Sequence, residues 1–116
     1  METLTNVDTI EGTLYIVGTP IGNLSDITLR ALEVLKSVDL IIAEDTRRTL
    51  KLLNHFEISK PIDSFNERNS SRKMDKIISF LKMGKNIAQV SDAGMPVISD
   101  PGANLVERCY KEGIKV

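Results

Sequence analysis

The sequence predicts an α/β fold, an open and mainly parallel five-stranded sheet with helices on both faces. Short apolar runs alternate with longer segments in which apolar residues recur at helical spacing, and no stretch repeats another. Strands that alternate with helices form right-handed βαβ units, which place their strands parallel in one sheet. In such a sheet the ligand site is expected in the crevice at the carboxyl ends of the strands.

The first half of the chain is predicted to hold two strands and two helices. Residues 13–18 (TLYIVG) and 40–43 (LIIA) are predicted to be buried strands. Ser25 and Asp26 are expected to cap the first helix, and residues 46–54 (TRRTLKLLN) to form a second, shorter one. The residues expected on the inner face of the first helix are Thr28, Ala31, Leu32 and Leu35.

The second half is predicted to continue the alternation. It holds a third strand over residues 61–64, a helix over 71–83, and a fourth strand over 86–90 (NIAQV). A last helix is expected to end at Gly113, and residues 114–116 to begin a fifth strand. The residues expected on the inner faces of the two helices are Met74, Ile77, Ile78 and Leu81, then Leu105, Val106, Cys109 and Tyr110.

Length and composition bound the class of protein. With 116 residues, 41% of them hydrophobic, the chain fits one small domain. No apolar run approaches the roughly 20 residues of a membrane-spanning helix, and no signal peptide is recognisable, so we expect a cytoplasmic protein. The single cysteine, Cys109, is expected to pack in the core. His55 has neither a cysteine partner nor a second histidine, so no metal site is predicted.

The charges are unevenly distributed although the net charge is -1. Residues 1–45 hold eight acidic and two basic side chains, whereas residues 46–116 hold eight acidic and thirteen basic ones. The modestly basic second part could supply phosphate contacts to a nucleic acid. A solvated helix surface rich in lysine and glutamate gives the same count, so both interpretations stay open.

The loop after the first predicted strand, residues 18–23 (GTPIGN), is suited to a rigid, tight turn. Its glycines tolerate positive φ, whereas Pro20 fixes its own φ and lacks an N–H donor. The loop does not have the G-x-G-x-x-G spacing with which backbone amides receive a pyrophosphate, so a dinucleotide site is not indicated. A plain strand-to-helix turn remains an alternative to a ligand-binding loop.

The loop after the second strand, residues 44–48 (EDTRR), joins two carboxylates and two guanidiniums. Asp45 or Thr46 would make a sound N-cap for the following helix. Capping does not explain Arg47 and Arg48, because the helix dipole disfavours cations at this end. These arginines therefore indicate a phosphate or carboxylate partner.

The loop after the fourth strand, residues 91–102 (SDAGMPVISDPG), is the most informative of the three. Asp100 and Pro101 form a favoured helix start, which explains the end of the segment. Asp92 has no such structural explanation. It stands at the carboxyl end of a buried strand, close to Gly94, where the backbone can approach a ligand. This favours a ligand-facing role, with a turn-forming Asx role as the alternative.

At these loops the sequence resembles the tetrapyrrole methylase superfamily, and within it the ribosomal RNA small-subunit methyltransferase I group. The segments GTLYIVGTPIGNLSDITLRALEVLKSVDLIIAEDTRRTLKLLNHF and VSDAGMPVISDPG are similar to that group's signature segments in order and spacing, over roughly residues 12–116. Two positions depart from the pattern. Met95 stands where a threonine is expected, and residues 64–69 (SFNERN) lack the histidine usual in this loop.

The resemblance implies an enzyme that transfers a methyl group from S-adenosylmethionine to the ribose 2′-hydroxyl of a cytidine in small-subunit ribosomal RNA. It also implies a homodimer whose cofactor lies between two domains. Residues 1–116 would then be the amino-terminal α/β domain, with the carboxy-terminal domain absent from this chain. The positions that align with the family's cofactor contacts are Pro20, Asp92, Ala93, Gly94 and Val97.

Location alone suggests roles for further residues. A ribose hydroxyl is a weak nucleophile, and Asp45 and Asp92 are candidates for a general base. The candidates for contacts with RNA are Arg47, Arg48, Asn66, Arg68 and Arg72. Two alternatives remain: a methylase of a tetrapyrrole, such as a corrin or porphyrin precursor, and, for this chain alone, a non-catalytic dimerisation module.

Overall fold

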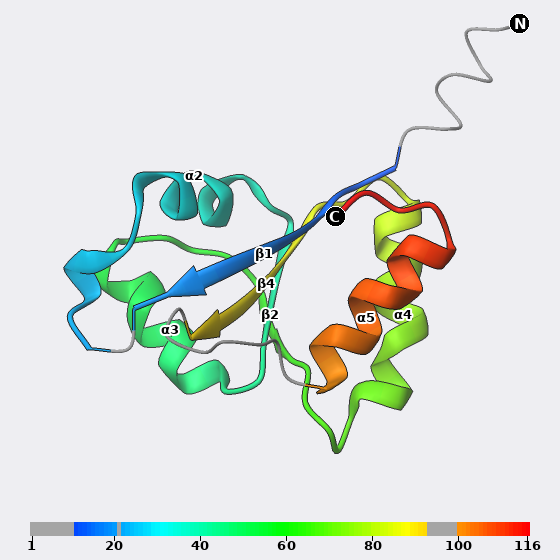
Figure 1. Cartoon of the computed structure of the whole chain (residues 1–116). Helices are drawn as coiled ribbons and strands as arrows, with labels where there is room; N and C mark the ends of the chain where they lie inside the picture. Colours follow the sequence, from blue (N-terminus) through cyan, green and yellow to red (C-terminus); the bar gives the residue numbers. More distant parts are fainter. Residues whose placement is uncertain (1–10, 21, 93–99) are drawn as a thin grey trace, which may run out of the picture.

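The computed structural model describes residues 11–20, 22–92 and 100–116 and confirms the α/β fold (Figure 1). Its strands are β1 (Leu14–Thr19), β2 (Leu40–Ala43), β3 (Ile62–Ser64) and β4 (Ile87–Asp92). They alternate with the helices α2 (Leu29–Ser37), α3 (Thr46–His55), α4 (Ser70–Lys82) and α5 (Asp100–Lys111), and a short 3-10 helix, η1 (Leu24–Asp26), precedes α2.

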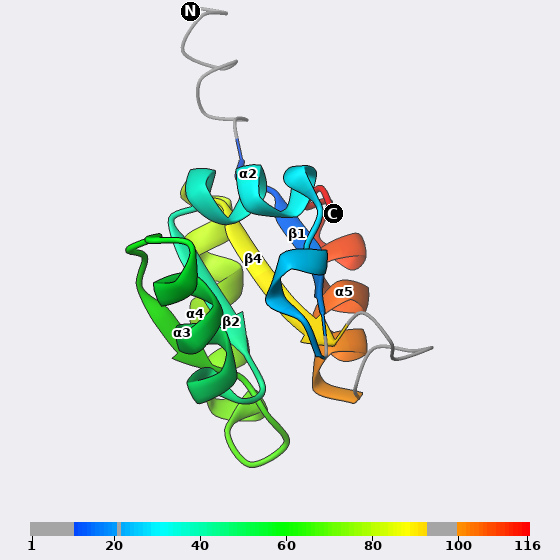
Figure 2. The ribbon, with the colours of Figure 1, turned by 90° about the vertical axis from the view of Figure 1, so that its left-hand side faces the viewer.

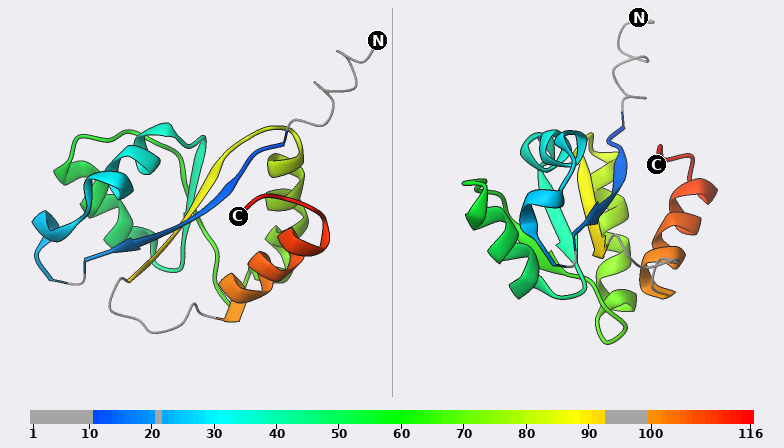
Figure 3. Two further views of the ribbon diagram at one scale, coloured as in Figure 1. Left: turned by 45° about the horizontal axis from the view of Figure 1, so that its top comes forward. Right: turned by 60° about the vertical axis from the view of Figure 1, so that its left-hand side comes forward.

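The strands are parallel and lie in the order β1-β4-β2-β3. The connections from β1 to β2 and from β2 to β3 step across the sheet in one direction, whereas the connection from β3 to β4 steps back. Because such crossovers are right-handed, opposite steps place their helices on opposite faces. Accordingly α2 and α3 cover one face, and α4 and α5 cover the other (Figures 2 and 3).

Two apolar clusters fill the spaces between the sheet and its helices. The α2–α3 side buries Leu35 and Leu53 against Ile41 of β2. The opposite side buries Leu81 and Leu105. Since successive side chains of a strand point to opposite faces, neighbouring residues of one strand enter different clusters.

The number of strands differs from the prediction. Within the described residues the sheet has four strands, not five, because residues 114–116 make only an isolated parallel bridge between Lys115 and Thr13. The bridge lies beside β1, where a fifth strand would have to begin. The strands β1 and β4 extend to Thr19 and Asp92, slightly beyond their predicted ends.

Two predictions about the helices are wrong. Thr28, rather than Ser25 or Asp26, caps α2: its Oγ1 accepts a hydrogen bond from the Ala31 N–H at 3.0 Å, so Thr28 is not an inner-face residue. Tyr110, predicted on the inner face of the last helix, is 68% exposed. It lies about 100° around the helix from Cys109, which is buried. None of the helices in the described ranges is long and apolar enough to cross a membrane.

Cys109 packs in the core as predicted. Its side chain is fully buried on α5, and burial raises the pKa of its thiol to about 11. Since the thiolate is the reactive form of cysteine, this pKa keeps the side chain protonated and unreactive at neutral pH.

Gly12 is predicted to be sensitive to substitution. A Cβ at this position would lie 1.7 Å from the Lys85 carbonyl oxygen, so Gly12→Ala must displace the backbone. We expect a loss of about 1–3 kcal/mol in the free energy of unfolding, measured by urea denaturation. Gly22→Ala is the control, since nothing lies within 4 Å of its added Cβ. Equal losses in the two variants would contradict this reading.

Candidate functional site

The carboxyl ends of β1, β4 and β2 meet at one end of the sheet. Their registers place Thr19 opposite Asp92, and Ala43 opposite Val90. The three chemically unusual loops follow these strands, so the fold brings together segments that are far apart in the sequence. The three strand ends therefore meet where a ligand site is expected in a parallel sheet.

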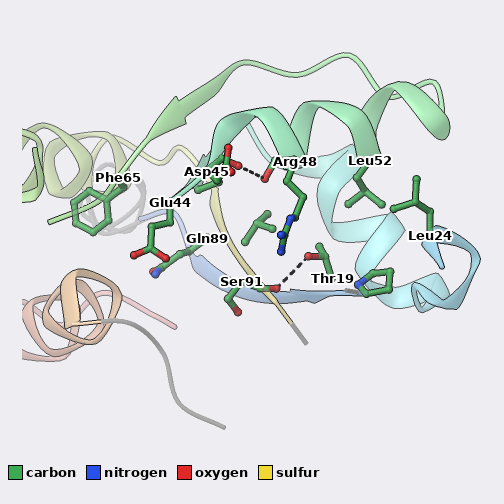
Figure 4. Close-up of a pocket in the computed structure, with 13 residues that line it drawn as sticks. Thr19, Leu24, Glu44, Asp45, Arg48, Leu52, Phe65, Gln89 and Ser91 are labelled. Atoms are coloured by element: carbon green, nitrogen blue, oxygen red, sulfur yellow. Dashed lines mark hydrogen bonds between the residues drawn. The ribbon is translucent and has the colours of Figure 1, made fainter. Parts of the chain in front are cut away.

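A cleft of about 140 Å³ opens at this end of the sheet. Figure 4 draws the 13 residues that line it, which come from β1, β2, β4, η1, α3 and the segments that directly follow β1, β2 and β3. The wall is mixed: Leu52 and Phe65 are apolar, whereas Glu44 and Arg48 are charged. A partly apolar cleft with a few polar groups is typical of a small-molecule site.

The loop after β1 contributes Pro20 to the cleft, where we predicted a cofactor contact. Beside it, the Thr19 hydroxyl donates a hydrogen bond to the Ser91 carbonyl oxygen at 3.2 Å. This bond ties the ends of β1 and β4 together (Figure 4). The Asn23 side chain accepts a hydrogen bond from the Ser25 N–H and caps η1, which fixes the exit of the loop.

The loop after β2 places Glu44, Asp45 and Arg48 in the wall of the cleft. Asp45 is the N-cap of α3: its Oδ1 accepts hydrogen bonds from the Arg47 N–H at 3.0 Å and from the Arg47 Nε at 3.4 Å. The backbone bond, more than the side-chain bond, lowers the pKa of Asp45. A lowered pKa makes this carboxylate a weaker proton acceptor, so its geometry favours capping over general-base catalysis.

The predicted residues after β4 are only partly described. Asp92 is the last residue of β4. Ala93, Gly94 and Val97, like Met95, lie outside the described residues. Helix α5 begins at Asp100, as the sequence predicted.

A polar network shapes the segment that joins β3 to α4. Lys73 donates from Nζ to Asp63 Oδ1 and to the Ser64 carbonyl oxygen, each at 2.8 Å. The Asn69 side chain donates to Ser64 Oγ at 2.9 Å and accepts from the Asn66 N–H at 2.9 Å. These bonds hold the turn directly after Phe65, which lines the cleft.

The predicted RNA contacts fall into two groups. Arg47 and Arg48 lie on the first turn of α3, beside the cleft. Arg68, in the turn before α4, and Arg72, in the first turn of α4, are exposed. The side-chain oxygen of Asn66 accepts a hydrogen bond from the Arg68 N–H at 3.0 Å, within the same turn.

Sequence reasoning missed the polar residues that the strands themselves bring to the cleft. Gln89 is 6% exposed and lines the cleft from β4, although it was predicted only as part of a buried strand. The signal was present, since a glutamine interrupts an otherwise apolar run (NIAQV). Lys73 was missed because its role depends on a contact between α4 and β3, which sequence spacing does not reveal.

The chain is similar to proteins of known family. A model of the tetrapyrrole (corrin/porphyrin) methylases matches residues 13–116. A ribosomal RNA small subunit methyltransferase I of Thermotoga maritima is 67% identical over 105 residues, which are 90% of this chain and 47% of that protein. The protein of the same name from Escherichia coli O157:H7 is 53% identical over 111 residues, 96% of this chain and 39% of that protein.

These matches confirm the resemblance noted from the sequence, and the chain spans less than half the length of these curated relatives. Among solved structures, a uroporphyrin-III-C-methyltransferase from Thermus thermophilus superimposes with a TM-score of 0.67 at 20% identity. The match covers 90% of this chain and 45% of that one. At this identity the likeness supports the fold.

The contact between Lys73 and Asp63 predicts a pH dependence. The hydrogen bond from Lys73 lowers the pKa of Asp63, so the bond stabilises the fold above the carboxyl's unfolded pKa and is lost as pH falls through its folded value. In Lys73→Met, we expect NMR titration to show the Asp63 pKa rising toward its ordinary range. Lys76→Met is the control, because among the groups that shift the Asp63 pKa, Lys76 contributes least. Equal shifts in both variants would refute the assignment.

Proposed function

The chain belongs to the tetrapyrrole (corrin/porphyrin) methylase family, and we propose that it is the amino-terminal domain of a ribosomal RNA methyltransferase that uses S-adenosylmethionine. The observation that carries this proposal is the 67% identity to a relative named as a ribosomal RNA small subunit methyltransferase. The Arg47–Arg48 pair beside the cleft suits an anionic substrate, whether its charges are phosphates or carboxylates. The finer proposal is transfer to the ribose 2′-hydroxyl of a cytidine, in a cytoplasmic homodimer.

The chemical character of the residues that line the cleft suits S-adenosylmethionine. The cleft offers apolar surface for a nucleobase, a buried amide oxygen on Gln89, and exposed carboxylates on Glu44 and Asp45 that suit an ammonium group. Pro20 and the residues that begin at Asp92 would hold the group from the ends of β1 and β4. The chemistry that this cofactor supplies when bound is an electrophilic methyl group.

A second domain is part of the proposal. The cleft of about 140 Å³ is smaller than the roughly 300–1,000 Å³ of typical small-molecule pockets. We therefore propose that a carboxy-terminal domain, outside this chain, completes the site. A site enclosed by two domains would also exclude water and hold the hydroxyl in line with the methyl group, which is the main requirement of this transfer.

The function is tested with the proposed two-domain protein, small ribosomal subunits and a radiolabelled methyl donor. We expect label in the ribosomal RNA, and mass spectrometry of the digested nucleosides should identify 2′-O-methylcytidine. A parallel reaction offers a porphyrin precursor as acceptor. Label in the macrocycle alone would support the tetrapyrrole alternative, whereas label in neither acceptor would favour the non-catalytic dimerisation module.

The exposed arginines at the start of α4 are expected to bind RNA phosphates. Arg68→Gln and Arg72→Gln should each weaken RNA binding and reduce the slope of log K against log salt by about one. Filter binding over a range of salt concentrations measures both quantities. Lys111→Gln is the control, because Lys111 ends α5 at the opposite end of the sheet and pairs with Glu107. An unchanged slope in both arginine variants would argue against these contacts.

A further inference from the structure

Gln89 is a buried polar residue with an unused hydrogen-bond acceptor. Among the described residues, the buried polar side chains are Thr19, Thr49, Asn69 and Gln89. The first three make hydrogen bonds to neighbouring groups. The Oε1 of Gln89 is buried yet has no partner within the described part of the chain. Such an atom loses its hydration without compensation, which typically costs about 1–3 kcal/mol.

The fold fixes where this side chain lies. Gln89 is on the central strand β4, paired with Ile16 of β1 and Ile42 of β2. Its neighbours Ala88 and Val90 enter the α2–α3 cluster, so alternation along the strand turns Gln89 to the α4–α5 face. It nevertheless belongs to neither apolar cluster and lines the cleft instead. Figure 4 draws it on the same side of the cleft as Glu44 and Phe65.

The chemistry of this position selects its ligand. An acceptor without a partner needs an N–H or O–H donor. A cationic donor would be poorly served here, because a neutral amide cannot balance a charge next to a side chain that is only 6% exposed. The exposed carboxylates of Glu44 and Asp45 suit a cation better. The acceptor therefore suits a neutral donor on a group with apolar faces, such as a nucleobase amino group or a ribose hydroxyl.

We propose that Gln89 is a ligand-recognising residue of the cleft whose Oε1 accepts a hydrogen bond from a neutral donor of a bound nucleoside. This inference rests on the function proposed above and deepens it. Both the cofactor and the RNA target carry nucleosides, so either could supply the donor. The amide is then retained at a cost in stability, because it is satisfied only when the site is filled.

The test compares two buried amides in the proposed two-domain protein. Gln89→Met keeps the length of the side chain and removes its hydrogen-bonding atoms, whereas Asn69→Leu removes an amide whose oxygen and nitrogen both make hydrogen bonds. Without ligand, we expect Gln89→Met to keep or raise Tm and Asn69→Leu to lower it by several degrees. A comparable loss of Tm in Gln89→Met would show that its amide is satisfied within the protein and would overturn the proposal.

Binding is then measured by calorimetry with S-adenosylhomocysteine and, separately, with an RNA hairpin. We expect Gln89→Met to lower the affinity for one of the two ligands by about tenfold, the equivalent of ~1.4 kcal/mol. The ligand whose affinity falls is the source of the nucleoside that Gln89 binds. Unchanged affinity for both, with binding intact in the unmutated protein, overturns this inference alone. Failure of the unmutated protein to bind either ligand overturns the proposed function and this inference together.

Discussion

The insertion of β4 between β1 and β2 is the constraint on which the rest of the structure depends. Because all three strands are parallel, their carboxyl ends open at one place. After β3 the chain steps back across the sheet toward β1 instead of continuing outward. This change in the direction of the connections creates the crevice and also divides the helices between the two faces. One topological step thus positions Pro20, Asp45 and Gln89 around a shared cleft, although long stretches of chain separate them.

The central strand serves both the core and the site. Ile87 and Ala88 are fully buried and hold the two apolar clusters to the sheet. Toward its carboxyl end the same strand presents Gln89 and Ser91 to the cleft. A rigid, buried strand is a better support for a ligand-recognising group than a loop, since its position is fixed by neighbours on both sides. The cost of placing such a group so deep is the Oε1 of Gln89, which has no partner among the described residues.

Local signals in the sequence predicted the elements well, and long-range features poorly. The apolar run LIIA became β2 with its predicted bounds, because a short β-branched run between polar loops has few other solutions. Thr28 was assigned to an apolar face because helical spacing does not distinguish a cap from an inner position. The insertion of β4 and the contact of Lys73 with Asp63 depend on tertiary packing, which no local pattern encodes. The proposed roles of Ala93, Gly94 and Val97 remain predictions.

Cofactor binding in the cleft at the carboxyl ends of β1, β4 and β2 is the proposal on which the assigned function depends. A crystal structure of the proposed two-domain protein with S-adenosylhomocysteine tests it most directly. We expect density for the ligand between the domains, against Pro20 and the end of β4. Density elsewhere, for example at the opposite end of the sheet near Asp39 and Asn86, would contradict it.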